Sequence, residues 1–273
     1  MRKCLDWPVS VCSWSFQQDV QDVAAALKKL DVGYINLALL PALQDNGAEY
    51  LEFVKQQDWT ISATMINFPC EDYSSLESIQ ATGGIASDEH WEENQKLAQG
   101  AIDLTAELNT EYLLMHFGFL DHTQKEYAQK FYDRTKILAD YASEKGVKFI
   151  METGQESAED LKHFLEEINH PALYVNFDPA NMILYNKGVP AEAIKVLAPW
   201  IRHVHIKDAT LTKTPGTWGE EVPWGDGEVG AHNFLTILNA LGYKGAVAIE
   251  REAGDDRFGD IKLAAERISA FQV

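Results

Sequence analysis

Eight short apolar segments, each followed by a helical pattern, limit the fold of this sequence more than any other feature. The segments are rich in β-branched and aromatic residues and have the length of buried strands. Between them, apolar residues recur at helical spacing, as Val20, Val23, Leu27 and Leu30 do. Alternating strands and helices favour a parallel sheet, and eight such units close most naturally into a (β/α)₈ TIM barrel. The predicted strands are residues 9–14, 34–39, 61–66, 112–117, 147–152, 173–178, 201–207 and 246–250.

Residues typical of helix ends lie between these segments, as a barrel requires. Gly33, Gly146 and Gly242 each stand just before a predicted strand, where a helix C-cap is expected, and Ser157 is placed to cap the helix that follows it. An open doubly wound sheet is the second candidate, but the GxGxxG turn that its nucleotide site needs is missing after the first strand. A length of 273 residues suits one barrel, so we expect residues 1–273 to form a single domain.

The composition limits which classes of binding partner and which cellular compartment we expect. The formal net charge of −19 repels phosphodiester backbones, so we expect no nucleic-acid partner. Three cysteines are too few to staple a chain of this size and favour a reducing compartment. The N-terminal segment contains Asp6 and Pro8 where a signal peptide needs an unbroken apolar run, and no run reaches membrane-spanning length. We therefore expect a cytoplasmic protein without a membrane partner, whose oligomeric state stays open, a homo-oligomer being one option.

Four consecutive predicted strands end in polar side chains. Glu152 is the last residue of a strand that we otherwise expect to be buried, and Asp178 ends the next one. The two-residue period of a strand places His205 and Lys207 on one face, and it aligns Glu250 with Glu252 in the last strand. Because the carboxyl ends of barrel strands meet at one rim, we expect these side chains to lie close together.

Three carboxylates at one rim need compensation. A single buried glutamate or histidine is more often a salt bridge or a satisfied core residue, but three carboxylates near only His205 and Lys207 leave excess negative charge. The sequence therefore predicts one divalent metal ion bound by Glu152, Asp178, His205 and Glu250. Oxygen donors with one imidazole favour Mn²⁺, with Mg²⁺, Co²⁺ or Zn²⁺ as alternatives.

The same motifs resemble a known superfamily. METGQE around Glu152, NFDPAN around Asp178, HVHIKDA around His205 and IEREAG around Glu250 are similar to the xylose isomerase-like sugar isomerases and epimerases. The resemblance covers the whole barrel. It implies a TIM barrel with a Glu, Asp, His, Glu metal set on strands five to eight, which the four predicted ligands match.

Departures from particular branches of that superfamily are informative. Endonuclease IV and the ketose 3-epimerases carry a histidine three residues after the metal aspartate, where this chain has Asn181. The 3-epimerases also carry an arginine shortly after the metal histidine, and residues 207–211 contain none. Lys207 in HVHIKDA resembles instead the HxHxKD pattern of dehydratases and uncharacterised isomerases. The resemblance thus implies the site more firmly than the reaction, and an AP endonuclease is disfavoured.

The predicted reaction is proton abstraction next to a carbonyl. A divalent ion stabilises the enediolate of an α-hydroxy ketone, and Glu152 and Glu250, three strands apart, can act on opposite faces of the substrate. We therefore predict a metal-dependent keto-sugar isomerase or epimerase with Glu152, Glu250 and Lys207 as catalytic residues. A dehydratase of inosose type is the alternative, and a non-catalytic binding barrel is a third reading. Lys207 has a plainer alternative as the structural partner of Glu252.

Substrate contacts are predicted from polar and aromatic residues after the strands. The two longest irregular stretches, residues 69–88 and 210–230, both follow predicted strands, and we expect them to cover the substrate. We expect a carbohydrate, unphosphorylated because the acidic loop of residues 210–230 would repel a phosphate. His116 is expected to contact either the substrate or a metal ligand. Helix capping for Gln155 and Glu156 and core packing for some of the tryptophans are the competing interpretations. The expected substrate-binding residues are His116, Gln155, Glu156, Asn181, Trp14, Trp218 and Trp224.

Overall fold

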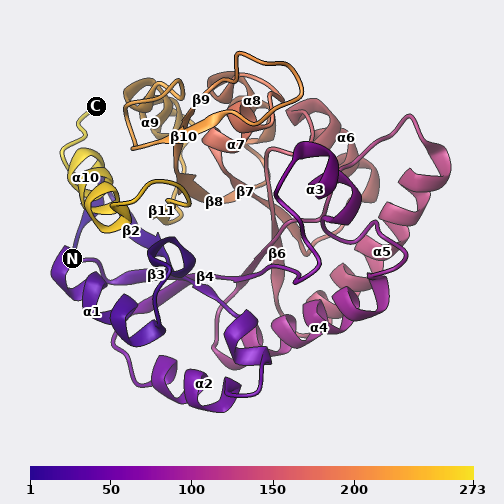
Figure 1. Cartoon of the computed structure of the whole chain (residues 1–273), viewed down its shortest axis with the longest axis horizontal. Helices are drawn as coiled ribbons and strands as arrows, with labels where there is room; N and C mark the ends of the chain where they lie inside the picture. The colour runs from indigo at the N-terminus through magenta and orange to yellow at the C-terminus, as the bar shows by residue number, and fades with distance from the viewer.

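The computed structural model describes all 273 residues and shows a closed parallel barrel surrounded by helices (Figure 1). Each strand pairs with the next along the chain, and the barrel closes because β11 pairs in parallel with β2. All eight predicted strands are present. They are β2 (Trp7–Cys12), β3 (Tyr34–Ala38), β4 (Thr60–Ile66), β5 (Tyr112–Met115), β6 (Lys148–Glu152), β7 (Leu173–Phe177), β8 (Ile201–Ile206) and β11 (Val247–Ile249).

Helices connect consecutive strands and cover the outside of the barrel. They bury their apolar faces against the strands, and one core cluster of 66 buried residues runs through both layers. The helices are α1 (Val20–Leu30), α2 (Gly47–Lys55), α3 (Leu76–Thr82), α4 (Trp91–Glu107), α5 (Lys125–Glu144), α6 (Ala158–Ile168), α7 (Pro179–Leu184), α8 (Pro190–Leu197), α9 (Ala231–Ala240) and α10 (Arg257–Ser269). None of them combines the length and apolar character needed to cross a membrane.

The first strand and the two long loops differ from the sequence-based expectation. The first strand stops at Cys12, and Trp14 lies in the short 3-10 helix η1 (Ser13–Phe16), so its ring leaves the alternation of the strand. The segment 69–88, expected to be irregular, contains α3, whose capping box is formed by Ser75 and Ser78. The segment 210–230 contains β10 (Glu220–Val222), which pairs with β9 (Asp208–Thr210). A second short helix, η2 (Leu40–Leu43), follows β3, and β1 (Lys3–Cys4) pairs with β2.

Predicted helix ends are confirmed at three of the four positions. Ser157 accepts the backbone N–H of Asp160 at the start of α6, and Gly146 and Gly242 have left-handed φ angles of 73° and 74°. At the end of α1 the left-handed residue is Asp31, with φ 55°, rather than Gly33. The helix ends two residues earlier than the glycine indicates, because Asp31 tolerates this conformation better than most side chains do.

We expect replacement of Gly146 by alanine to destabilise the protein by about 1 kcal/mol. No atom lies within 4 Å of the added Cβ, so the cost comes from the left-handed backbone alone. Gly146→Asn is the matched control, because asparagine adopts this conformation more readily. Urea unfolding followed by circular dichroism should rank wild type above Asn above Ala, and an alanine variant as stable as wild type would refute the assignment.

Candidate metal and catalytic site

The four predicted metal ligands converge at the carboxyl end of the barrel. Glu152 ends β6, Asp178 directly follows β7, His205 lies in β8, and Glu250 directly follows β11. One donor atom from each lies within 4.8 Å of the donor atoms of the other three. The side chains are almost completely buried, with Glu152 6%, Asp178 0%, His205 0% and Glu250 5% exposed.

His205 is at the centre of the cluster. Its Nδ1 lies 2.8 Å from Glu152 Oε1, 3.3 Å from Glu250 Oε2 and 3.5 Å from Asp178 Oδ2. Two buried atoms here, His205 Nδ1 and Asp178 Oδ2, lie close to oppositely charged or polar neighbours but make no hydrogen bond of good geometry. Buried polar atoms are rarely left without a hydrogen bond. The donor set and these two atoms fit a divalent cation, which all four side chains would hold.

Asn36 in β3 orients the His205 ring by contacting the ring nitrogen that faces away from the carboxylates. Its Oδ1 lies 3.2 Å from His205 Nε2, while its Nδ2 donates to the carbonyl of Ala63. Because the amide nitrogen is already engaged with Ala63, the amide oxygen faces Nε2 as an acceptor. The proton on Nε2 leaves Nδ1 as the ring atom that faces the carboxylates. Asn36 was not among the predicted site residues, although a polar residue inside an apolar strand is a sequence signal that could have identified it.

Asp178 is held by the helix that it caps. Its Oδ1 accepts the backbone N–H groups of Ala180 and Asn181 at 2.8 and 3.0 Å, and Pro179 occupies the first turn of α7. The second carboxylate oxygen therefore points back into the barrel. Gly154 permits the close packing behind it, because a Cβ at this residue would lie 2.4 Å from Asn181 Cβ.

The two glutamates have different partners. His116 Nε2 lies 2.7 Å from Glu152 Oε2, and Asn176 Nδ2 donates to Glu152 Oε1. Burial alone would lower the pKa of His116, but the adjacent Glu152 carboxylate outweighs burial and raises it to about 9. On the opposite side, Trp14 Nε1 donates to Glu250 Oε1 at 2.8 Å.

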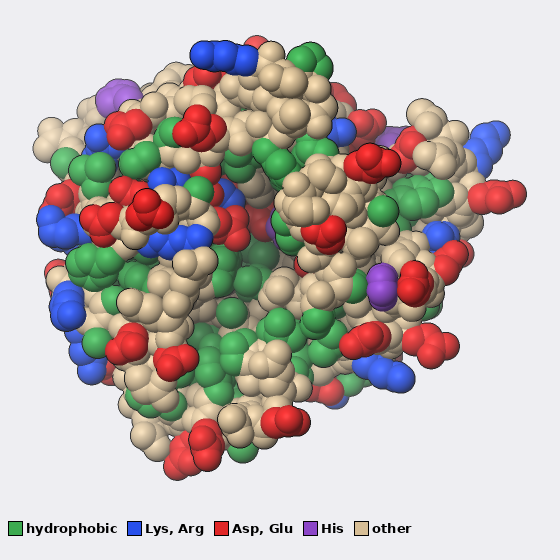
Figure 2. All heavy atoms as spheres, viewed as in Figure 1, with side chains coloured by type: hydrophobic (Ala, Val, Ile, Leu, Met, Phe, Trp, Pro, Cys, Tyr) green, Lys and Arg blue, Asp and Glu red, His purple; other side chains and the backbone are tan.

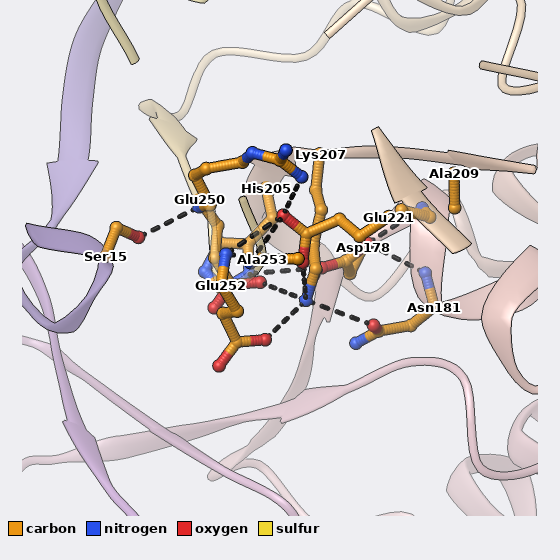
Figure 3. A network of polar contacts seen from close by, with 12 residues as sticks. Ser15, Asp178, Asn181, His205, Lys207, Ala209, Glu221, Glu250, Glu252 and Ala253 are labelled. Carbon is orange, nitrogen blue, oxygen red and sulfur yellow. Dashed lines mark hydrogen bonds and ion pairs between the residues drawn. The ribbon is translucent and has the colours of Figure 1, made fainter. Parts of the chain in front are cut away.

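Lys207 occupies a cage of carboxylates beside Glu250 (Figure 3). Its Nζ donates to Glu250 Oε2 at 2.9 Å and to Glu252 Oε2 at 2.7 Å, and Asn181 Oδ1 lies 3.4 Å away. Burial would lower its pKa, but these carboxylates raise it well above the usual value. Lys207 is therefore protonated, and it makes both the contact with Glu250 and the structural pair with Glu252.

Of the other expected substrate residues, Gln155 and Trp218 each have a polar atom without a hydrogen bond, whereas Trp224 lies in the core. Gln155 is buried, accepts the Gly118 N–H and leaves its Nε2 unpaired. Trp218 packs edge-on against Tyr185, and its Nε1 is also unpaired. The structure does not bring Trp224 to the cluster: its ring is 4% exposed and packs against Phe234 in the core.

Two residues of the segment 69–88 reach the site without having been predicted. The Tyr73 ring lies edge-on to His116, with ring centroids 6.3 Å apart. Glu71 accepts the backbone N–H groups of Phe68 and Gly84, and burial raises its pKa despite the proximity of His116. A loop without periodicity gave the sequence no indication of which side chains turn inward.

The fold and this cluster define a TIM barrel with three carboxylates and a histidine suited to a divalent cation. The family model for xylose isomerase-like TIM barrels matches residues 21–271. The chain belongs to that family, as its motifs predicted.

Two curated relatives match part of the chain. The uncharacterized protein YihM of Escherichia coli is 36% identical over 99 residues, 36% of this chain and 30% of that protein. An inosose dehydratase of Clostridium botulinum is 25% identical over 131 residues, 42% of this chain and 44% of that protein. The matched segments thus span less than half the length of either relative.

Solved structures share the fold over nearly the full length. A xylose isomerase domain protein from Planctomyces limnophilus has a TM-score of 0.84 at 26% identity, over 97% of this chain and 95% of that chain. A xylose isomerase-like protein from Mycobacterium smegmatis, in complex with magnesium, has a TM-score of 0.74 at 19% identity, over 98% and 97%. The 3-keto-D-glucoside 4-epimerase YcjR from E. coli has a TM-score of 0.72 at 14% identity, over 96% and 98%. For the last two, the similarity is one of fold.

We expect Mn²⁺ to bind with release of a proton and to stabilise the protein. Burial lowers the pKa of His205, but Cys12, Glu250 and Glu152 raise it well above its usual value. Because a metal ligand binds in its deprotonated form, we expect a proton to be released and the affinity to fall as pH falls. Calorimetry in two buffers of different ionisation enthalpy measures this release. At 100 times the dissociation constant, bound Mn²⁺ should add about 2.7 kcal/mol to the stability.

Asp178→Asn should weaken Mn²⁺ binding by at least about 100-fold, because changes merely next to a metal ligand already cost about 10 to 100-fold. Asp140→Asn, on the outside of the barrel in α5, is the matched control and should bind as wild type does. Equal Mn²⁺ affinity in both variants would show that the cluster is not the metal site.

Glu156 should make the stability depend on pH. Burial raises its pKa to about 8 from 4.5, so the folded state favours the protonated form, and stability contributed by this proton is lost as pH rises from about 4.5 to about 8. Each pKa unit corresponds to about 1.4 kcal/mol. Relative to Glu156→Gln, wild type should lose more than that between pH 5 and 8 in urea unfolding, whereas the exposed-site variant Glu159→Gln should follow wild type. Parallel curves for all three proteins would contradict the raised pKa.

Proposed function

We propose that this protein is a divalent-metal-dependent keto-sugar isomerase or epimerase that abstracts a proton next to a carbonyl group. One observation carries the proposal: two buried glutamates from different strands, Glu152 and Glu250, belong to one group of four converging donors, and each is held by its own hydrogen-bond donors. A purely structural metal site has no need for two such differently supported carboxylates. Mn²⁺ is the favoured ion, since three oxygen donors and one imidazole suit it.

Glu152 and Glu250 have different roles in the proposed proton transfer. When bound, the cation supplies Lewis-acid polarisation of a carbonyl and its neighbouring hydroxyl. Glu152 Oε2, hydrogen-bonded to His116, accepts the proton on carbon, and His116 holds this carboxylate in place. Glu250 would have to carry a proton at the start of this step and would return that proton from the other side, where Trp14 and Lys207 donate to its two oxygens. Protonation at the same carbon gives an epimer, and protonation at the adjacent carbon gives an isomer.

Dehydration is the second candidate, and Lys207 favours it. This protonated amine lies 2.9 Å from Glu250 and can donate to a hydroxyl that leaves from the carbon β to the carbonyl. The partial similarity to an inosose dehydratase supports the same candidate. The substrate in either case is a small carbohydrate, and the acidic surroundings of the site favour an unphosphorylated one.

The experiment is deuterium exchange. Mn²⁺-loaded protein in D₂O should incorporate deuterium next to the carbonyl of a ketose, a 3-keto sugar or an inosose, and product analysis then separates an epimer from a dehydrated ketone. Glu152→Gln and Glu250→Gln should each slow exchange by about 100-fold or more, the usual contribution of general acid–base groups.

Exchange is compared at equal, directly measured Mn²⁺ occupancy, because both residues are also proposed ligands. Glu166→Gln, on the outer helix α6, is the control and should exchange as wild type does. Full exchange in both active-site variants would exclude the two-glutamate mechanism. Absence of exchange in wild type with every substrate would exclude the proposed reaction class.

A further inference from the structure

A cavity lies over the carboxyl ends of β2 and β3, next to the candidate metal site. Its volume is about 780 Å³, and it is bounded by η1 and the start of α1 on one side and by η2 and α2 on the other. None of the four metal-ligating side chains lines it, so this space is additional to that around the cluster. The barrel face in Figure 2 is hollowed at its centre, with hydrophobic side chains along the wall.

Trp14 connects the cavity with the metal cluster. Its ring lines the cavity, its Nε1 donates to Glu250 Oε1, and its centroid is 6.1 Å from that of His205. A molecule with one end at the cluster can therefore continue along this indole into the cavity. Flat aromatic faces of this kind pack against the apolar faces of sugar rings.

The walls are preorganised by contacts inside the protein. Tyr50 donates its hydroxyl to the carbonyl of Ala38 at 2.7 Å, and the Ala38 N–H donates to Ser13 Oγ at 2.9 Å. All three residues line the cavity. These bonds fix the Tyr50 ring and the floor beneath it, so a ligand would not need to order them.

The chemistry of the lining selects a neutral polyhydroxylated group. Neither lysine nor arginine is among its 14 residues, and three carboxylates would repel an anion. Side-chain amides and carboxylates accept hydrogen bonds from hydroxyl groups, and amides also donate. These polar residues are Gln18, Asp19, Gln21, Gln44, Asp45, Asn46 and Glu49.

We propose that this cavity holds a second sugar unit, so that the substrate is a glycoside or disaccharide of a keto sugar rather than a free monosaccharide. A volume of about 780 Å³ lies within the range of about 300 to 1,000 Å³ typical of sites for whole drug-sized ligands. One sugar ring at the cluster would leave it empty. The inference rests on the proposed function for the reacting end of the substrate and adds the chemical identity of its other end.

The test compares a 3-keto hexose with disaccharides that contain it, using Mn²⁺-loaded protein and deuterium exchange. We expect kcat/KM to be at least tenfold higher for a disaccharide. Glu49→Trp should fill the cavity and remove that advantage, while leaving exchange with the free keto hexose unchanged. Glu52→Trp, one turn further along α2 and outside the lining, should change neither. Equal kcat/KM for both substrates in wild type, or an equal loss for both in Glu49→Trp, would overturn the proposal.

Binding provides a readout that does not depend on catalysis. Saturation-transfer NMR with maltose and cellobiose should detect binding that glucose does not match at the same concentration, and Glu49→Trp should abolish it. Disaccharide binding without exchange on any substrate would retain the cavity assignment and reject the proposed reaction. Exchange without discrimination between mono- and disaccharides would retain the reaction and reject the cavity assignment.

Discussion

Three carboxylates buried around one imidazole are the constraint on which the active end of this barrel depends. Charges removed from water are costly unless they are paired, and pairs on the periphery of the cluster do not relieve its centre. His116 compensates Glu152 from one side and Lys207 compensates Glu250 from the other, whereas Asp178 Oδ2 makes no hydrogen bond and has only longer contacts, 3.5 Å to His205 Nδ1 and 3.9 Å to Lys207 Nζ. The shortfall of positive charge lies where the donor atoms converge, which is why a cation fits this place.

The surrounding structure keeps this arrangement from relaxing. A carboxylate could rotate away from its neighbours, but Asp178 is tied to the start of α7 and Glu250 to Trp14. A deeper polar layer supports Glu152 through Asn176, whose Oδ1 lies 2.8 Å from His203 Nδ1. Burial lowers the pKa of His203 to about 3, so this ring is neutral and adds no charge below the cluster. The positive groups are thus confined to the rim.

The sequence predicted the parts of the site that depend on periodicity. Polar residues at the ends of β6, β7, β8 and β11 pointed to the four side chains that converge in the structure, because the strand period determines which side chains face inward. Periodicity has no bearing on Glu71 and Tyr73, which reach His116 from a loop, or on Trp14, which turns toward Glu250 only because β2 ends at Cys12. Trp224 was expected to contact the substrate but packs against Phe234 in the core. The sequence alone does not distinguish these two roles for an aromatic residue in a βα loop.

The unequal supports of the two glutamates bear on the proposed reaction. Glu152 is hydrogen-bonded to the imidazole of His116, whereas Glu250 is hydrogen-bonded to an indole and a protonated amine, so the two carboxylates have donors of different kinds. A site for reversible transfer between two equivalent faces would have no reason for this difference. The asymmetry instead favours one direction of transfer, with removal of the proton on the side of Glu152 and its return on the side of Glu250. Since Trp14 on that second side also lines the neighbouring cavity, the placement of an extended substrate and the polarity of proton transfer would depend on the same side chain.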